Sequence, residues 1–377
     1  MTIKQRGLIS IVIALSCAFI FQYFRVPEPS IQPKPDLNKH PLYSNYQFSA
    51  DPKIINMGIQ PLGVPIGAVS ELIKRDKILH KKLDQLGFKL SFYDFLKGSD
   101  LFYFWEKGLD IGLSGDMPTL MAATNHDIVI TSLVKQEFTS LVAREYGLLS
   151  ELKNKRIGVP FGSNAHYSIL RALKLENIAS EDVTLINIDL QEYAQSLNER
   201  SIDAFAAWEP FPTLARKIDP ELVVIHKGLS TSYLLISIQL FNKHPEVAKL
   251  VLAAQLRAMR WMNLSRKNLY QASTWQLKAY EVLMQKKSLL NVKENAELIR
   301  NGLLNITDTP IIPETSLAEG GFLHQAFLFL QKMNKISVNA SWQHVYKSFQ
   351  PELLAAVLAD KKHYQLEIFD YREGSHE

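Results

Sequence analysis

The chain has 377 residues and carries 42 lysines and arginines against 38 aspartates and glutamates, which gives a formal net charge of +4. This small surplus excludes a strongly basic nucleic-acid-binding protein, so we expect no nucleic-acid partner. With 47% hydrophobic and 21% charged residues the chain is typical of a globular protein of roughly two domains, and its single cysteine, Cys17, excludes an intramolecular disulfide and a cysteine-cluster metal site.

The N-terminus has the pattern of an export or membrane-targeting segment. Two basic residues precede an uncharged, largely apolar stretch at 7–24, which is near the minimum length for crossing a bilayer. We expect residues 1–25 to be a signal peptide or a membrane anchor. Three outcomes stay open: an uncleaved anchor, cleavage near Ala18, or acylation of Cys17 in a lipoprotein-like box. Each predicts a periplasmic or extracytoplasmic protein, and the first predicts a tether to the inner membrane.

Residues 26–50 are expected to form a linker, because five prolines between Val26 and Pro41 favour an extended chain. Folded structure should begin at Asp51. Strands and helices alternate from there, which favours an α/β protein with mostly parallel sheets.

The expected elements repeat one order in two successive halves, which indicates a duplicated architecture. The expected strands are 54–59, 90–95, 109–113, 128–133, 139–144, 156–160, 183–188 and 202–207. The helices expected between them are 66–86, 101–107, 118–125, 167–175 and 193–199. The C-terminal third is predicted to be helical, with helices at 245–262, 267–286, 292–303, 322–335 and 343–361.

The first candidate site motif is DIGLSGDMPTL, residues 110–120. A strand ends before Ser114 and Gly115 turn the chain, Asp116 occupies the N-cap position, and Pro118 sits in the first helical turn. A helix N-terminus offers unpaired N–H groups and a partial positive charge, so it can hold a small anion. The alternative is that Ser114 and Asp116 only cap the helix.

The second motif, GVPFGSNAHYSILRAL, repeats this strand-to-helix geometry. Gly162 allows close approach of the backbone, Ser163 supplies a hydroxyl, and Asn164 or Ala165 supplies N–H donors. His166 could add a donor or could be structural. The sequence has neither a Walker lysine nor GxGxxG, which argues against a nucleotide-phosphate site.

The third motif places Trp208 and Glu209 directly after the expected strand 202–207. Open α/β sheets bind their ligands at such strand ends, so Trp208 could line an apolar part of a ligand and Glu209 could accept from an amine. The alternative is a buried tryptophan beside a glutamate that starts a helix. Gln60 and Leu62, in the turn after the first strand, complete a set of loops that would converge on one cleft.

Five segments in this order resemble the solute-binding proteins of ABC importers for sulfonate, taurine and nitrate: QPLGVPIG, LDIGLSGDMPTLMAA, RIGVPFGSNAHYSIL, SIDAFAAWEPFPTLA and FNKHPEVAKL. The resemblance implies the two-lobed α/β fold of a type 2 periplasmic binding protein. Two crossings, near 137–140 and 228–232, would join the lobes. Lobe I would then comprise residues 51–137 and 231–377, including the C-terminal helices, and lobe II residues 138–230.

The resemblance also implies a ligand site, a function and partners. The ligand-binding residues carried over by motif position are Gln60, Leu62, Ser114, Gly115, Asp116, Ser163, Asn164, Ala165, His166, Trp208 and Glu209. We expect a monomer that captures a small anionic or zwitterionic solute and delivers it to an ABC permease and ATPase complex. No cofactor and no metal are expected.

Two carboxylates in the expected cleft narrow the ligand chemistry. Asp116 and Glu209 would repel a bare anion and fit a zwitterion such as taurine better. A membrane-tethered sensor that uses the same cleft is the alternative function. Catalysis is not expected, because the sequence has no GxSxG or HExxH motif, no cysteine outside the N-terminal segment, and none of the cysteine-rich character of thiamine-pyrimidine synthases.

Overall fold

The computed structural model describes residues 36–190, 192–304, 306 and 309–371. The expected N-terminal anchor, Cys17 and the first part of the linker lie outside the described residues. The chain divides into two compact units, one up to Tyr46 and the other from Gln47 onward. In the first unit a short 3-10 helix, η1 (Leu37–Lys39), is capped by Asp36, which accepts a hydrogen bond from the N–H of Asn38.

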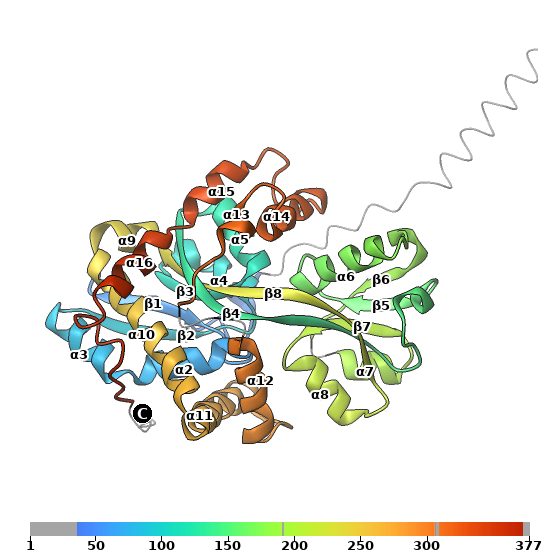
Figure 1. The fold of residues 1–377 in the computed structure, drawn as a ribbon, viewed down its shortest axis with the longest axis horizontal. Coiled ribbons are helices and arrows are strands. Elements are labelled where there is room, and N and C mark those ends of the chain that lie inside the picture. The colour runs from blue at the N-terminus through green and yellow to red at the C-terminus, as the bar shows by residue number, and fades with distance from the viewer. Residues whose placement is uncertain (1–35, 191, 305, 307–308, 372–377) are drawn as a thin grey trace, which may run out of the picture. The chain divides into compact units, whose positions relative to one another are not determined.

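The second unit is built on an eight-stranded sheet with helices on both faces (Figure 1). The strand order is β2-β1-β3-β8-β4-β7-β5-β6. The strands are β1 (Ile54–Ile59), β2 (Lys89–Asp94), β3 (Ile111–Gly115), β4 (Ile128–Ala143), β5 (Arg156–Val159), β6 (Thr184–Asn187), β7 (Ala204–Trp208) and β8 (Val223–Ser237).

The sheet is mixed, so the expectation of mostly parallel sheets is wrong at its centre. The first strand group (β2, β1 and β3) is parallel, and so is the second strand group (β7, β5 and β6). The three central pairs, β3 with β8, β8 with β4 and β4 with β7, are antiparallel. The reason is that β4 carries the chain from the first group to the second, whereas β8 carries it back in the opposite direction.

The strands expected at 128–133 and 139–144 are one continuous strand, β4, which pairs with β8 along most of its length. The polar residues between them predicted a break, but the strand passes through with bulges between Ile130 and Ser132 and between Leu133 and Lys135. The expected crossings at 137–140 and 228–232 lie in these two strands and pair with each other. The lobe boundaries themselves stay a prediction.

The helices follow the apolar periodicity, and the C-terminal third is helical as expected. They are α2 (Ile66–Arg75), α3 (Lys77–Gln85), α4 (Gly98–Tyr103), α5 (Asp116–Asn125), α6 (Asn164–Leu175), α7 (Tyr193–Asn198), α8 (Phe211–Ile218), α9 (Ile238–Lys243), α10 (Pro245–Leu264), α11 (Arg266–Met284), α12 (Val292–Leu304), α13 (Glu314–Leu317), α14 (Phe322–Lys332), α15 (Trp342–Ser348) and α16 (Pro351–Ala359). Among the helices described, none has the length and apolar content needed to cross a bilayer.

Two expected helices are each split in two. The helix expected at 66–86 breaks at Asp76, whose carboxylate caps α3 by accepting from the N–H of Leu79 at 2.9 Å. The helix expected at 343–361 breaks before Pro351, which lacks an N–H and begins α16.

Two apolar clusters cover the faces of the second strand group. Ala165 and Ile169 of α6 pack on one face together with Ile157 and Val159 of β5. The other face carries a separate cluster that includes Ala215 of α8. Figure 1 shows α5 and α6 on the same side of the long strands β4 and β8, with α8 and α12 on the other. This arrangement places the N-termini of α5 and α6 near the central strands.

Candidate functional site

Helix α5 begins directly where β3 ends. Gly115 is its N-cap and Asp116 its first residue, so the expectation that Asp116 is the N-cap is wrong by one position. The Asp116 carboxylate nevertheless satisfies one N–H group at the start of its own helix, because Oδ1 accepts a hydrogen bond from the N–H of Met117 at 2.8 Å. Pro118 lies in the first turn, as expected, where its missing N–H costs no helical hydrogen bond.

Helix α6 begins after a tight turn in which Gly162 has a φ of +77°. Ser163 is the N-cap, and its Oγ accepts from the N–H of His166 at 3.3 Å. The N–H groups of Asn164 and Ala165, the first two of the helix, have no hydrogen-bond acceptor in the described part of the chain. This end of α6 therefore offers two free backbone donors and the positive end of a helix dipole.

The two helix starts meet at the carboxylate of Asp116. The Asn164 side chain donates from Nδ2 to Asp116 Oδ2 at 2.8 Å. Thr231 of β8 donates to the same oxygen from its backbone N at 3.0 Å and from Oγ1 at 3.1 Å. With the bond from Met117, the carboxylate accepts four hydrogen bonds while Asp116 is 1% exposed. One buried anion thus joins α5, α6 and β8.

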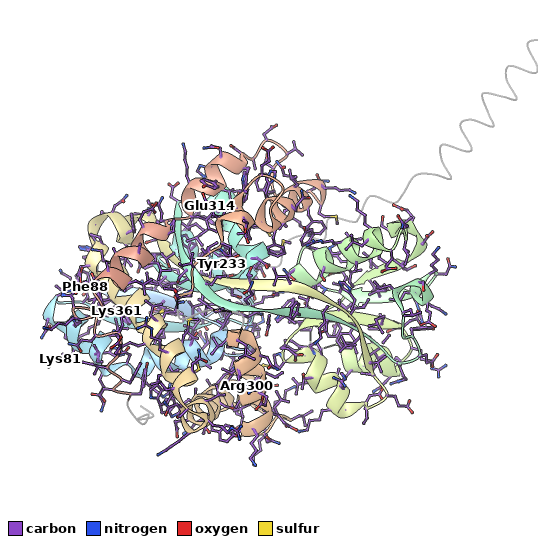
Figure 2. The ribbon with its side chains drawn as sticks, in the orientation of Figure 1. Lys81, Phe88, Tyr233, Arg300, Glu314 and Lys361 are labelled. Carbon is purple, nitrogen blue, oxygen red and sulfur yellow. The ribbon has the colours of Figure 1, made fainter. Side chains whose placement is uncertain are left out.

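The electrostatics of Asp116 reflect two opposing effects. Burial raises the pKa of its carboxyl above the ordinary value, whereas the hydrogen bonds from Thr231, Asn164 and Met117 act to lower it. Tyr233, labelled in Figure 2, extends the network because its hydroxyl lies 2.8 Å from Thr231 Oγ1. Sequence reasoning missed Thr231. The only signal that could have indicated it was the run of three hydroxyl residues, 230–232, inside an expected crossing.

Gln60 and Ser114 lie together beside Gly98. The Gln60 side chain donates from Nε2 to the carbonyl of Leu113. A Cβ on Gly98 would lie 2.3 Å from Ser114 Oγ and 3.4 Å from Gln60 Nε2, so only glycine leaves room for them. Leu62, in the same turn as Gln60, is buried. Gly98 is thus a supporting residue that no motif indicated.

Three buried oxygens around the two helix starts lack hydrogen bonds among the described residues, namely Thr119 Oγ1 in the first turn of α5, Ser114 Oγ and Asn164 Oδ1. Ser114 is 0% and Asn164 7% exposed. Buried polar atoms in folded proteins are nearly always paired with protein or solvent. These atoms are therefore where a bound molecule or an ordered water would complete the network.

His166 stabilises the turn that begins α6. Its Nδ1 accepts from the N–H of Gly162 at 3.1 Å, and its ring stacks on Phe161 and meets Phe329 edge to face. Burial, with the nearby charge of Lys335, lowers its pKa from 6.5 to about 4, so the imidazole is neutral at pH 7. These contacts give His166 a structural role in the turn, and its expected contact with a ligand stays a prediction.

Lys335 contributes a positive charge at the start of α6, and sequence reasoning missed it. A Cβ on Gly162 would lie 2.9 Å from Lys335 Cε, so the lysine stem covers this turn. Lys335 is exposed and follows α14, far from the motif in sequence. No local pattern could have indicated a contact between segments so far apart.

Trp208 is the last residue of β7 and Glu209 directly follows it, but the two side chains have different surroundings. Trp208 is partly buried and packs on the apolar cluster that contains Ala165 of α6. Glu209 accepts a long hydrogen bond of 3.4 Å from the N–H of Thr213. Burial raises the pKa of Glu209, and the charge of Lys135 on β4 acts to lower it. Within the described residues, no hydrogen bond links this pair to Asp116 or Asn164.

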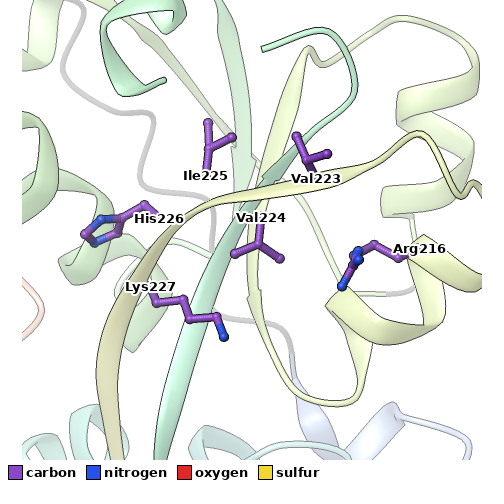
Figure 3. Close-up of a pocket in the computed structure, with 6 residues that line it drawn as sticks. All are labelled: Arg216, Val223, Val224, Ile225, His226 and Lys227. Atoms are coloured by element: carbon purple, nitrogen blue, oxygen red, sulfur yellow. The ribbon is translucent and has the colours of Figure 1, made fainter. Parts of the chain in front are cut away.

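A separate hollow of about 540 Å³ lies along β8 and α8. Figure 3 shows its lining, which consists of Arg216, Val223, Val224, Ile225, His226 and Lys227. None of the expected ligand-binding residues lines this hollow.

Comparison with known proteins places the chain beside ABC solute-binding proteins. A model of the NMT1-like family matches residues 106–277. The taurine-binding periplasmic protein of Escherichia coli (strain K12) is 27% identical over 150 residues, which cover 37% of this chain and 47% of that protein. The chain spans about half the length of the curated relatives it matches. The resemblance to the sulfonate, taurine and nitrate solute-binding proteins is thereby confirmed.

Solved structures establish the fold. The alkanesulfonate-binding protein SsuA from Xanthomonas axonopodis pv. citri, bound to MOPS, superposes with a TM-score of 0.60 at 16% identity, over 80% of this chain and 99% of that one. A mutant of the desulfurization enzyme DszB, in complex with biphenyl-2-sulfinic acid, superposes with a TM-score of 0.56 at 14% identity, over 81% and 99%. The periplasmic-binding fold is therefore present, and fold alone does not separate a binding protein from an enzyme.

Proposed function

We propose that this protein is an extracytoplasmic solute-binding protein that captures a small anionic or zwitterionic solute and delivers it to an ABC importer. The solute would be sulfonate-like, taurine-like or nitrate-like. The observation that carries the proposal is the convergence of α5 and α6 on one buried network, beside two free backbone donors and the unpaired oxygens of Ser114 and Asn164. The curated relatives support the same general role.

The anionic group of the solute would lie at the start of α6. The free N–H groups of Asn164 and Ala165 and the helix dipole stabilise negative charge there. Lys335 adds a full positive charge above the same turn. Ser163 keeps its hydroxyl proton available, because its Oγ acts only as an acceptor in the helix cap. Trp208 would contact an organic part of the solute.

Capture would couple to closure of two lobes. If residues 138–230 form lobe II and residues 51–137 with 231–377 form lobe I, the hydrogen bond from Asn164 to Asp116 connects the lobes. A solute that contacts both helix starts favours the closed arrangement over the open one and shifts the population toward it. The closed monomer would then engage a permease and ATPase complex, with the N-terminal segment holding it at the membrane.

Removing the charge of Lys335 tests this anion site. We expect K335Q to weaken binding of ethanesulfonate or taurine about two- to fivefold, because one neighbouring charge contributes up to roughly 1 kcal/mol at an exposed site, where solvent screens it. K332Q is the matched control, since Lys332 is also exposed and ends α14, the helix that Lys335 follows. Calorimetric titration of the full chain measures both affinities.

The titration distinguishes three outcomes for the anion site and the proposed function. Loss of affinity in K335Q with wild-type affinity in K332Q supports the site. Equal affinities in K335Q, K332Q and the wild type would place the anion elsewhere. Absence of binding for sulfonates, taurine and nitrate alike would contradict the proposed function.

A further inference from the structure

Asn164, whose side chain donates to the Asp116 carboxylate, also carries a hydrogen-bond acceptor that is unpaired among the described residues. Asn164 uses Nδ2 to donate to Asp116, and this bond fixes the orientation of its amide because a carboxylate accepts and cannot donate. Its other terminal atom, Oδ1, is therefore an oxygen without a donor, on a side chain 7% exposed. An acceptor beside an anionic carboxylate favours one kind of neighbour, a group that brings hydrogen and positive charge.

We propose that Asn164 Oδ1 and the Asp116 carboxylate form a subsite that recognises a protonated amine on the solute. This inference rests on the proposed function, because it takes the anionic group of the same solute to lie at the first N–H groups of α6. Both halves of a small zwitterion would then contact Asn164, one at its backbone and the other at its side chain. The solute class is an aminosulfonate or a similarly compact amino acid.

The subsite discriminates by charge and by hydrogen bonding. A solute without an amine leaves Asn164 Oδ1 unpaired and adds a second negative charge near Asp116, where low local polarity strengthens repulsion. A protonated amine supplies the missing donor and offsets the carboxylate charge. A binding site rejects a ligand strongly when that ligand leaves one of the site's buried polar groups without a hydrogen-bond partner.

Glu209 is the competing position for an amine, and its surroundings differ. Burial raises the pKa of Glu209, and the positive charges of Lys135 and Lys227 partly oppose this rise, whereas no lysine or arginine of the described residues acts on Asp116 in this way. These cations offset the Glu209 charge in part, although Lys135 also forms an ion pair with Glu137. Among the described residues, the partners of the Asp116 carboxylate are neutral hydrogen-bond donors, so its charge gains more from a cationic ligand.

Calorimetric titration of the full chain with taurine and with ethanesulfonate, which lacks only the amine, tests the subsite. We expect the wild type to bind taurine at least tenfold more tightly, the effect of one charge-assisted hydrogen bond. N164A should reduce this preference to less than about threefold, and D116N should do the same. N125A, at the far end of α5, should retain the wild-type preference. Thermal melts report whether each variant folds.

N164A decides the outcome if D116N does not fold, because in N164A the carboxylate of Asp116 keeps three of its four hydrogen bonds. A wild type that binds both ligands equally would overturn the subsite and leave the proposed function standing. If the preference for taurine survives in N164A and disappears in E209Q, the amine binds at Glu209. This result would also overturn the proposed subsite. If neither ligand binds the wild type, the proposed function itself fails.

Discussion

At the scale of single residues, His166 links the stability of the site to pH. Its folded pKa of about 4 lies below the ordinary value of 6.5, because the ring is buried and lies near the charge of Lys335. The unfolded chain takes up a proton near pH 6.5, whereas the folded chain does so only near pH 4. The contribution of His166 to stability is therefore complete above pH 6.5 and is lost as the pH falls toward 4.

We expect H166N to reduce this pH dependence. Asparagine can accept from the N–H of Gly162 through Oδ1 without titrating, and the shift of His166 corresponds to about 3 kcal/mol in the free energy of unfolding. Urea denaturation at about pH 4.5, 5.5 and 7.5 measures that free energy for both proteins. If the free energy of unfolding falls equally steeply with pH in H166N and in the wild type, His166 is not the cause of the pH dependence.

The residue types that define the candidate site could be predicted, but their partners could not. Glycine, serine and asparagine after a buried strand predicted the free amides of α6. Short-range turn chemistry determines this feature. Thr231 and Lys335 contact the same site from other parts of the chain. Their roles depend on the packing of α6 against β8 and α14, which no local pattern contains.

At the scale of elements, the close approach of α6 to β8 depends on Gly228. A Cβ at this position would lie 1.8 Å from Ser168 Oγ and 2.7 Å from Ser168 Cβ. We expect G228A to push α6 away from β8 and to lower the free energy of unfolding by about 1–3 kcal/mol. Urea denaturation measures this loss.

Two further variants separate steric conflict from other effects of the substitution. In G147A the new Cβ meets no atom closer than 3.9 Å, so we expect little change. Adding S168G to G228A removes the conflicting atoms and should recover part of the lost stability. If G228A is as stable as the wild type, or if adding S168G recovers no stability, the close contact between Gly228 and Ser168 does not determine the position of α6.

Element positions could largely be predicted from apolar periodicity, whereas long-range polar pairing could not. The break expected within β4 arose from Lys135, Gln136 and Glu137, whose polarity is typical of a loop. In the fold Lys135 and Glu137 are buried and form an ion pair with each other, so the strand continues. Near the C-terminal end of the described residues, Asp370 forms a long-range ion pair, with Lys77 at 2.9 Å.

At the scale of the whole molecule, the proposed function depends on two helix starts that follow strands of different strand groups, α5 after β3 and α6 after β5. Alternating strands and helices predicted an α/β protein, and the family resemblance implied two lobes. The direction of the central strands followed only from the path of β4 and β8 between the strand groups. In the proposed account a bound solute contacts α5 and α6 at once. Neither helix start alone would couple capture to closure.

Hydrogen–deuterium exchange of the full chain with and without taurine tests this claim most directly. Binding between the helix starts should slow exchange in both first turns together, at residues 116–120 of α5 and 163–167 of α6. The hollow lined by Arg216 and Val223–Lys227 should be unaffected. Slower exchange confined to that hollow, or to one of the two helices, would contradict the account.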